Sequence, residues 1–133
     1  MKNRSMRGNA LIESIVGVGI VFVPLVLFAA DLAVMFHAAH ANEEFAEQLA
    51  RLCSTLPDQA NAIQACSDVI RQYRLPSNIS KLEYSNLNFD IRAQEVSLTT
   101  SMVVAMPVPF PGYSSVTVSA NVKQPIVSVP VPR

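Results

Sequence analysis

The stretch MKNRSMRGNALIESIVGVGIVFVPLVLFAA, residues 1–30, places three basic side chains before a long apolar run that contains one carboxylate, Glu13. Residues 14–30 carry no charge, and after Asp31 the apolar run continues to Phe36. A helix that crosses a bilayer needs about 20 mainly apolar residues. We therefore expect residues 10–36 to form one membrane-crossing helix.

Lys2, Arg4 and Arg7 set the expected orientation of this helix, because positive charge is retained on the cytoplasmic side of a membrane. The N-terminus is expected in the cytoplasm, and the rest of the chain beyond the helix is expected on the other side. Cleavage as a secretory signal is the alternative, since Ala29 and Ala30 followed by Asp31 resemble a small-residue cleavage site.

The charge of the chain is zero overall but unevenly distributed, with ten basic and ten acidic residues among 133. Three basic residues precede Gly8 and all acidic residues follow it, so residues 9–133 hold seven basic against ten acidic residues, or −3. Nucleic-acid binding requires a basic patch. This distribution argues against a nucleic-acid partner and favours a membrane-sorting role for the basic N-terminus.

Cys53 and Cys66 are the two cysteines, and 12 residues separate them. In an oxidising compartment such a pair is expected to form a disulfide. A loop of this size would contribute about 3 kcal/mol in the chain-entropy model. Two buried thiols are the alternative, and a zinc site is not expected because no second ligand pair has zinc spacing.

After the apolar run, the helix is expected to continue with one buried face, so that a single helix covers residues 9–52. Apolar residues recur at steps of three and four, which is typical of one helical face: Val34, Ala38, Ala41, Phe45, Leu49 and Leu52. The opposite face is charged: Glu43, Glu44, Glu47 and Arg51. Pro24 is expected to kink the helix, because it removes a backbone hydrogen bond.

A second, shorter helix is predicted between Asp58, a suitable N-cap, and Pro76, which would end it. Its buried face is predicted to contain Ile63, Cys66, Val69, Ile70 and Tyr73. A disulfide from Cys66 to Cys53 would then join this helix to the end of the long one.

From Ile79 the apolar period changes to two, which is typical of strands. Three strands are predicted, with these alternating positions: Leu82, Tyr84, Leu87, Phe89 and Ile91; Val96, Leu98, Thr100, Met102 and Val104; Val116, Val118, Ala120 and Val122. The alternation slips near Asn86, which predicts a bulge or a turn. Residues 90–94 are expected to form the first connection. Residues 107–112 are expected to form the second, because alternating prolines cannot join a central sheet ladder.

These elements predict an α+β fold, in which an antiparallel meander packs against a long N-terminal helix and a short second helix. The proline-rich tail from Pro125 to Arg133 is expected to be extended and solvated.

No enzyme motif is present, since the chain has no Gly-rich phosphate loop and no nucleophile elbow. We therefore predict a non-enzymatic protein with no catalytic residues and no cofactor. His37, His40 and Glu44 share one helical face at a spacing that could bind a metal, but a polar stripe is the favoured interpretation and no metal is predicted. Asp31 is expected at the outer face of the membrane, where the helix leaves the lipid.

The start of the chain combines a basic leader, Gly8, Glu13 at the fifth position after Gly8, and a long apolar helix. In these residues the chain resembles the precursors of type IV pilins and pseudopilins. The resemblance implies that a prepilin peptidase cuts after Gly8, that Asn9 becomes the mature N-terminus, and that Glu13 acts in assembly. It also implies a pilin-like division of the chain into a leader, 1–8, a transmembrane segment, 9–36, and an exported α+β domain, 37–133.

Within that family, residues 7–13 are most similar to the TadE/TadF-type minor pseudopilins of the tight-adherence (Tad) pilus. Ser14 stands where the major pilins of that group usually carry Tyr, and Pro24 lies eleven residues after Glu13. A type IVb minor pilin and a type II secretion pseudopilin are the alternatives within the family.

The resemblance implies a structural subunit that is incorporated in, or primes, a Tad-like type IV pilus for adhesion or secretion. Its implied partners are the prepilin peptidase, other pilin and pseudopilin subunits, the pilus assembly platform and the bacterial inner membrane. It would cross that membrane once, with its C-terminal domain in the periplasm, before joining the pilus. The alternative function is an uncleaved, membrane-anchored periplasmic binding or adaptor protein.

Glu13 has a physical reason to be retained in such a subunit. A carboxylate in the middle of a bilayer costs about 2.5–3.5 kcal/mol on insertion scales, and less near the interface. Cleavage after Gly8 would create an α-amino group at Asn9, which could pair with Glu13 in the same or a neighbouring subunit. Because an unmatched buried charge is costly, this pair would select the correct packing register.

Overall fold

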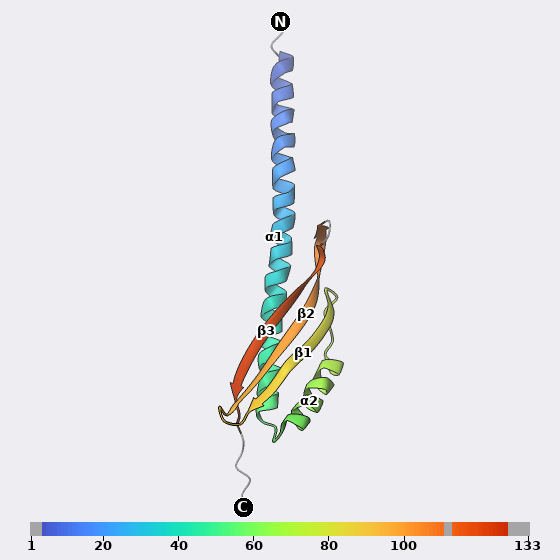
Figure 1. Cartoon of the computed structure of the whole chain (residues 1–133). Helices are drawn as coiled ribbons and strands as arrows, with labels where there is room; N and C mark the ends of the chain where they lie inside the picture. The colour runs from blue at the N-terminus through green and yellow to red at the C-terminus, as the bar shows by residue number, and fades with distance from the viewer. Residues whose placement is uncertain (1–3, 111–112, 128–133) are drawn as a thin grey trace, which may run out of the picture.

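The computed structural model of the chain describes residues 4–110 and 113–127, with side chains described for 10–108 and 113–127. It is an α+β structure, as predicted, and a long helix projects from a small head (Figure 1). The elements are α1 (Arg4–Ser54), α2 (Gln59–Gln72), β1 (Ile79–Asp90), β2 (Glu95–Phe110) and β3 (Tyr113–Pro125).

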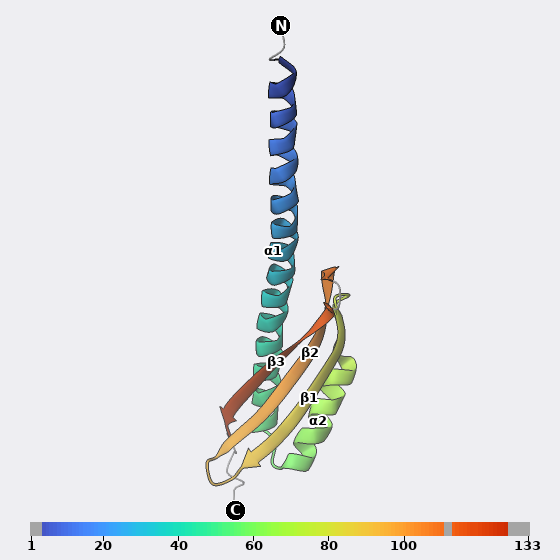
Figure 2. The same cartoon turned by 45° about the horizontal axis from the view of Figure 1, so that its top comes forward.

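The long helix α1 contains 51 residues and is therefore about 77 Å long at ~1.5 Å per residue. It begins at Arg4 rather than near Asn9, so it includes the second half of the predicted leader. Pro24 lies inside it, and the helix continues through this residue without interruption. Figures 1 and 2 show no sharp bend along α1, so the predicted kink is wrong. The helix stays continuous although Pro24 removes one backbone hydrogen bond.

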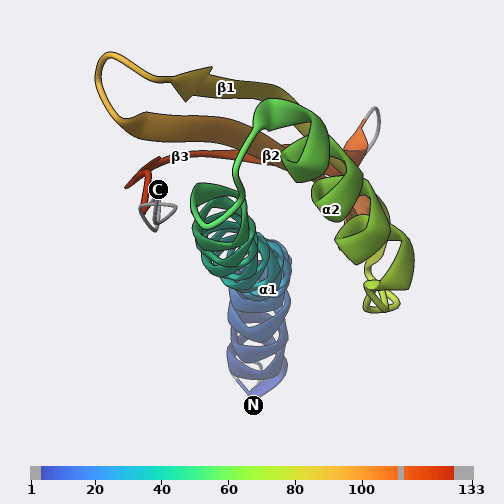
Figure 3. The ribbon, with the colours of Figure 1, turned by 90° about the horizontal axis from the view of Figure 1, so that it is seen from below.

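The sheet is an antiparallel meander in the order β1-β2-β3, as predicted. Both helices lie on the same face of the sheet, with α1 against β2 and β3 and α2 against β1 (Figure 3). The face that meets the helices includes every second residue of β2: Val96, Leu98, Thr100, Met102 and Val104, all buried. This is the alternation that the sequence predicts for an antiparallel sheet covered on one side.

A β-bulge in β1 explains the slip in its apolar pattern. Ser85 lies opposite Thr99 and Asn88 lies opposite Ser97, so β1 has one more residue than β2 in this interval. Asn86 has a positive φ of 54°, a conformation that Asn adopts more readily than most residues. The extra residue reverses the parity of the strand, so that Leu87 packs against the core after the bulge as Leu82 does before it.

The first connection agrees with the prediction, because Asp90 Oδ1 accepts hydrogen bonds from the backbone N–H groups of Arg92 (2.9 Å) and Ala93 (3.0 Å) and closes a turn. Ile91 lies in this turn, within the predicted connection of residues 90–94, and is 83% exposed, so it does not continue the apolar alternation of the first strand. The second connection, in contrast, is shorter than the predicted residues 107–112. β2 continues through Pro107 to Phe110, and the register with β3 is irregular between Ala105 and Phe110, where a proline is tolerated.

The core is formed mainly by the C-terminal half of α1 and the inner face of the sheet. Ala38, Phe45 and Leu49 are buried as predicted, whereas Leu52 is 37% exposed. Residues of α1 outside the predicted apolar face are also buried: Asn42, Ala46, Ala50 and Cys53. The small alanines let the helix approach the sheet closely, and the charged residues at 43, 44, 47 and 51 are exposed, as predicted.

The second helix begins where the sequence predicts, because Asp58 Oδ1 accepts the backbone N–H of Asn61 at 2.8 Å. Cys66 is buried on its inner face, but Ile63 is 44% exposed and Ala62 takes the buried position instead. The apolar periodicity therefore predicted the position of the helix correctly, but the face that it predicted to be buried is one residue off at Ile63.

The start of the C-terminal tail packs against the head, which corrects the prediction of a solvated segment. β3 extends to Pro125. Beyond it, Ile126 donates a backbone hydrogen bond to Gln94 (2.8 Å) and Val127 donates one to Ser54 (3.1 Å). The predicted tail beyond residue 127 lies outside the described residues.

Candidate functional site

The N-terminal half of α1 is apolar and uncovered. None of residues 10–30 is buried by the head. The sheet begins to cover the helix at Asp31. This is the helix of the described chain that is long and apolar enough to cross a membrane. Its large exposed apolar side chains are Leu11, Ile12, Ile15, Val16, Val18, Ile20, Val21, Phe22, Val23, Leu25, Val26, Leu27 and Phe28. A single-pass membrane anchor is compatible with this surface.

Gly8, Asn9 and Glu13 lie on α1 at the start of this apolar surface. Glu13 follows Asn9 by four residues, which places both on one face of the helix and about 6 Å apart along its axis. The Glu13 side chain is exposed, and no hydrogen bond or ion pair joins it to any side chain that the structure describes. The Glu13 carboxylate is therefore accessible to a cation of another subunit or to the α-amino group that cleavage would create at Asn9.

Asp31, which is expected at the outer face of the membrane, is buried inside the head, and this burial is not apparent from the sequence. It is only 2% exposed, because β2 crosses over it. Its Oδ1 accepts the backbone N–H of Val108 at 3.1 Å. Its Oδ2 is also buried and has no hydrogen-bond partner among the described residues. The sequence showed a lone carboxylate at the end of an apolar run, but the strand that covers it is 77 residues away.

Asn42 forms a buried polar link between α1 and the sheet. Its Nδ2 donates to the carbonyl oxygens of Val118 (3.1 Å) and Thr100 (3.4 Å), and its Oδ1 accepts the Thr100 hydroxyl at 2.8 Å. Asn42 and Thr100 are both 0% exposed. Because each polar atom of the Asn42 amide is paired, the link fixes the register of the helix against β2 and β3.

Asn42→Ala is expected to lower the free energy of unfolding of the head by about 1–3 kcal/mol, because it leaves the buried Thr100 hydroxyl and two carbonyls short of a partner. Urea unfolding of the full chain in detergent, followed by circular dichroism, measures the change. Glu43→Ala, at the neighbouring exposed position, is the control and should change stability by less than about 0.5 kcal/mol. Equal effects of the two substitutions would show that the Asn42 network does not support the fold.

Cys53, near the end of α1, and Cys66, in α2, lie together in the core, both 0% exposed. The structure holds them as thiols with sulfur atoms 2.9 Å apart. The hydrogen bond between them lowers the pKa of Cys53, and the same bond together with burial raises the pKa of Cys66. The predicted disulfide would join the elements that the sequence assigned to it.

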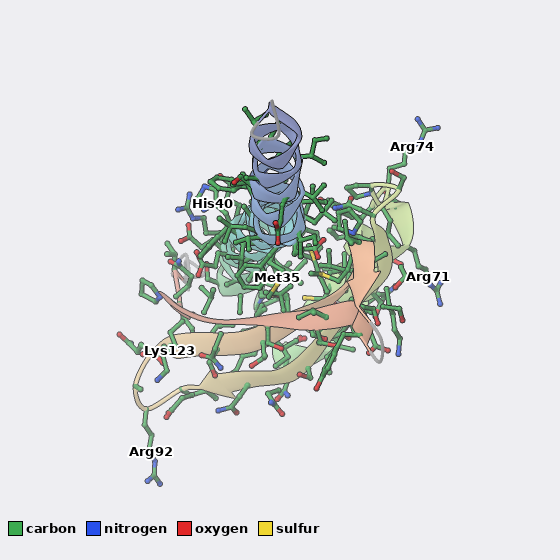
Figure 4. All side chains as sticks on the ribbon, turned by 90° about the horizontal axis from the view of Figure 1, so that it is seen from above. Met35, His40, Arg71, Arg74, Arg92 and Lys123 are labelled. Atoms are coloured by element: carbon green, nitrogen blue, oxygen red, sulfur yellow. The ribbon has the colours of Figure 1, made fainter. Side chains whose placement is uncertain are left out.

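The polar stripe on α1 holds no metal-like cluster. His40 Nε2 lies 3.3 Å from Glu44 Oε1 on the exposed side of the helix, where Figure 4 shows His40 pointing away from the sheet. Arg51 pairs with Glu47 at 3.2 Å, as the spacing predicted. Among the described residues, no group of three potential ligands comes together.

A cavity of about 350 Å³ lies at the other end of the head from the apolar helix, beside the start of α2. Its lining is mostly apolar: Leu56, Pro57, Phe89, Ile91 and Ile126, together with Asp58, Gln59 and Gln94. Asp58 is the charged group in this lining, and its carboxylate is already engaged as the N-cap of α2.

Comparison with known protein families, curated proteins and solved structures found no match to this chain. The fold and the surface still define a class, which is an α+β head carried on a long apolar helix, consistent with a pilin-like fold. A more specific assignment depends on the residues at the start of α1.

Proposed function

We propose that this protein is a minor pseudopilin, processed after Gly8 and incorporated in, or priming, a Tad-like type IV pilus. The observation that carries the proposal is the placement of Gly8 and Glu13 at the start of a helix that is apolar and uncovered for residues 14–30. An anchor needs only the apolar run. Cleavage by a prepilin peptidase would explain Gly8, and assembly of subunits into a filament would explain Glu13.

The uncovered apolar surface of α1 supports a role in helix-to-helix packing. An apolar surface of this extent requires lipid or other apolar helices to cover it. In the membrane lipid covers it, and in a filament the corresponding helices of neighbouring subunits would replace the lipid. Because α1 continues without interruption from this surface into the core of the head, a force on the helix would be transmitted directly to the head.

Glu13 would act in assembly through its charge. In the filament its carboxylate would be surrounded by apolar helices, and the α-amino group at Asn9 is the cation that processing creates nearby. The pair adds little net stability, but a subunit packed in the wrong register would leave one of the two charges buried and unmatched. Glu13 would therefore discriminate correct from incorrect packing without taking part in any reaction.

Gly8→Val is expected to block processing, because the peptidase would recognise the residue before the cut. Immunoblots of cells with and without the prepilin peptidase measure this as retention of the longer precursor. Gly17→Ala is the matched control, since beyond the adjoining helix backbone no described atom lies within 4 Å of the added methyl group, and it should be processed normally. Normal processing of Gly8→Val would contradict the proposed cleavage site.

The same experiment separates the proposal from an uncleaved periplasmic adaptor. An adaptor anchored by α1 would keep residues 1–8 whether or not the peptidase is present. A pseudopilin would lose them only in cells that contain the peptidase.

A further inference from the structure

The boundary between the uncovered and the packed part of α1 is sharp. Ala30 is exposed and Asp31 is 2% exposed. The charge-free run of residues 14–30 ends at the same place. The outer face of the bilayer is therefore expected close to Asp31 when α1 crosses the membrane.

The end of the β2 and β3 pair is held at this level. Val108 in β2 donates its backbone N–H to Asp31 Oδ1 at 3.1 Å, so the strand is attached to α1 at its first packed residue. From this point the strand pair continues towards the uncovered half of α1, as Figures 1 and 2 both show. We call Pro107, Val108 and Tyr113 the membrane-proximal strand end.

This strand end has the composition of a membrane interface. No charged residue occurs between Glu95 and Lys123, and these two form an ion pair of 3.0 Å at the opposite end of the strands. Tyr113 is 71% exposed at the membrane-proximal strand end, and Pro107 is also exposed. Tyr is enriched at headgroup depth, where its ring meets apolar chains and its hydroxyl meets water.

We propose that the membrane-proximal strand end lies in the phospholipid headgroup layer of the bilayer that α1 crosses, with Asp31 as the residue that positions it. The head would then rest on the membrane at two points, α1 and Tyr113, and could not rotate freely about the helix. The proposal needs α1 to cross a membrane, as the pseudopilin assignment does, but it does not need cleavage after Gly8 or assembly into a filament.

The chain contains no Trp, so Tyr113→Trp places a single fluorescent reporter at the proposed contact. The unprocessed full chain would be reconstituted at low density in vesicles of phosphatidylethanolamine and phosphatidylglycerol that carry bromine at different acyl-chain depths. Arg92→Trp is the matched control, because Arg92 lies at the opposite end of the sheet and projects away from the head (Figure 4).

We expect the indole emission of the Tyr113→Trp variant to be blue-shifted and to lose at least about half its intensity with bromine near the headgroups, and less with bromine near the bilayer centre. The control should keep the emission of a water-exposed indole. Equal emission from the two reporters would overturn the proposal, and so would strongest quenching at the bilayer centre. Shielding of the Tyr113→Trp reporter from both bromine and aqueous iodide would also overturn it, because that result indicates a protein contact.

Asp31 is tested in the Tyr113→Trp background. Asp31→Ala removes the acceptor for the Val108 amide and should reduce the headgroup quenching, whereas Asp31→Asn keeps a carbonyl oxygen in place and should preserve it. If Asp31→Ala leaves the quenching profile unchanged, Asp31 does not position the strand end. A failure of the peptidase experiment would leave these results unaffected, since they use the unprocessed chain.

Discussion

Glu13→Ala is expected to leave processing after Gly8 intact and to reduce incorporation into filaments by about tenfold or more, because it leaves the new α-amino group at Asn9 without a partner in an apolar core. The defect should appear after cleavage, since Glu13 is exposed and no hydrogen bond or ion pair joins it to a described side chain in the isolated chain. Shearing of pili from cells, followed by quantification of the subunit in the sheared and membrane fractions, measures the loss.

A second substitution at Glu13 and a control at the neighbouring Ser14 test whether the charge itself is needed. Glu13→Gln keeps the size of the side chain and removes its charge, so it should be defective as well. Ser14→Ala is the control, because Ser14 Oγ only donates to Ala10 O within the helix, at 2.8 Å. Normal incorporation of Glu13→Gln would show that the charge of Glu13 is not needed and would remove the pairing argument.

The predicted disulfide between Cys53 and Cys66 would contribute about 3 kcal/mol to the free energy of unfolding of the head, so reduction is expected to lower it by that amount. The two residues are fully buried side by side and join α2 to the end of α1. Unfolding of the full chain in detergent, with and without reductant, measures the difference. The double variant Cys53→Ala and Cys66→Ala is the control and should not respond to reductant.

Mass spectrometry of the protein purified without reductant provides the independent check on this predicted disulfide. The oxidised protein should be lighter than the reduced protein by two hydrogens and should resist alkylation until it is unfolded and reduced. Two alkylatable thiols after unfolding without reductant would contradict the prediction and support the alternative of two buried thiols.

The elements of this fold could be predicted from the sequence because their patterns are local. The alternation in β2 located its buried face correctly, and the slip at Asn86 located the bulge. Asp58 was correctly identified as the cap of α2. The exact width of a buried face was harder to predict, since Leu52 and Ile63 continue the helical period but are 37% and 44% exposed.

The polar contacts inside the head could not be predicted in the same way. Asn42 is polar and lies on a helix with charged residues, but its partner Thr100 is 58 residues away and becomes adjacent only in the folded sheet. The burial of Asp31 depends in the same way on Val108. The continuation of β2 through Pro107 was missed for a related reason, because the neighbouring amide of Val108 bonds to Asp31 on α1.

The account depends most directly on the N-terminus of the mature protein. Intact-mass and N-terminal peptide mass spectrometry would be applied to the protein purified from cells with an active prepilin peptidase and from cells without it. The account predicts a protein that begins at Asn9 in the first case and retains residues 1–8 in the second. A protein that keeps residues 1–8 in the presence of the peptidase, or that begins at Asp31, would contradict it.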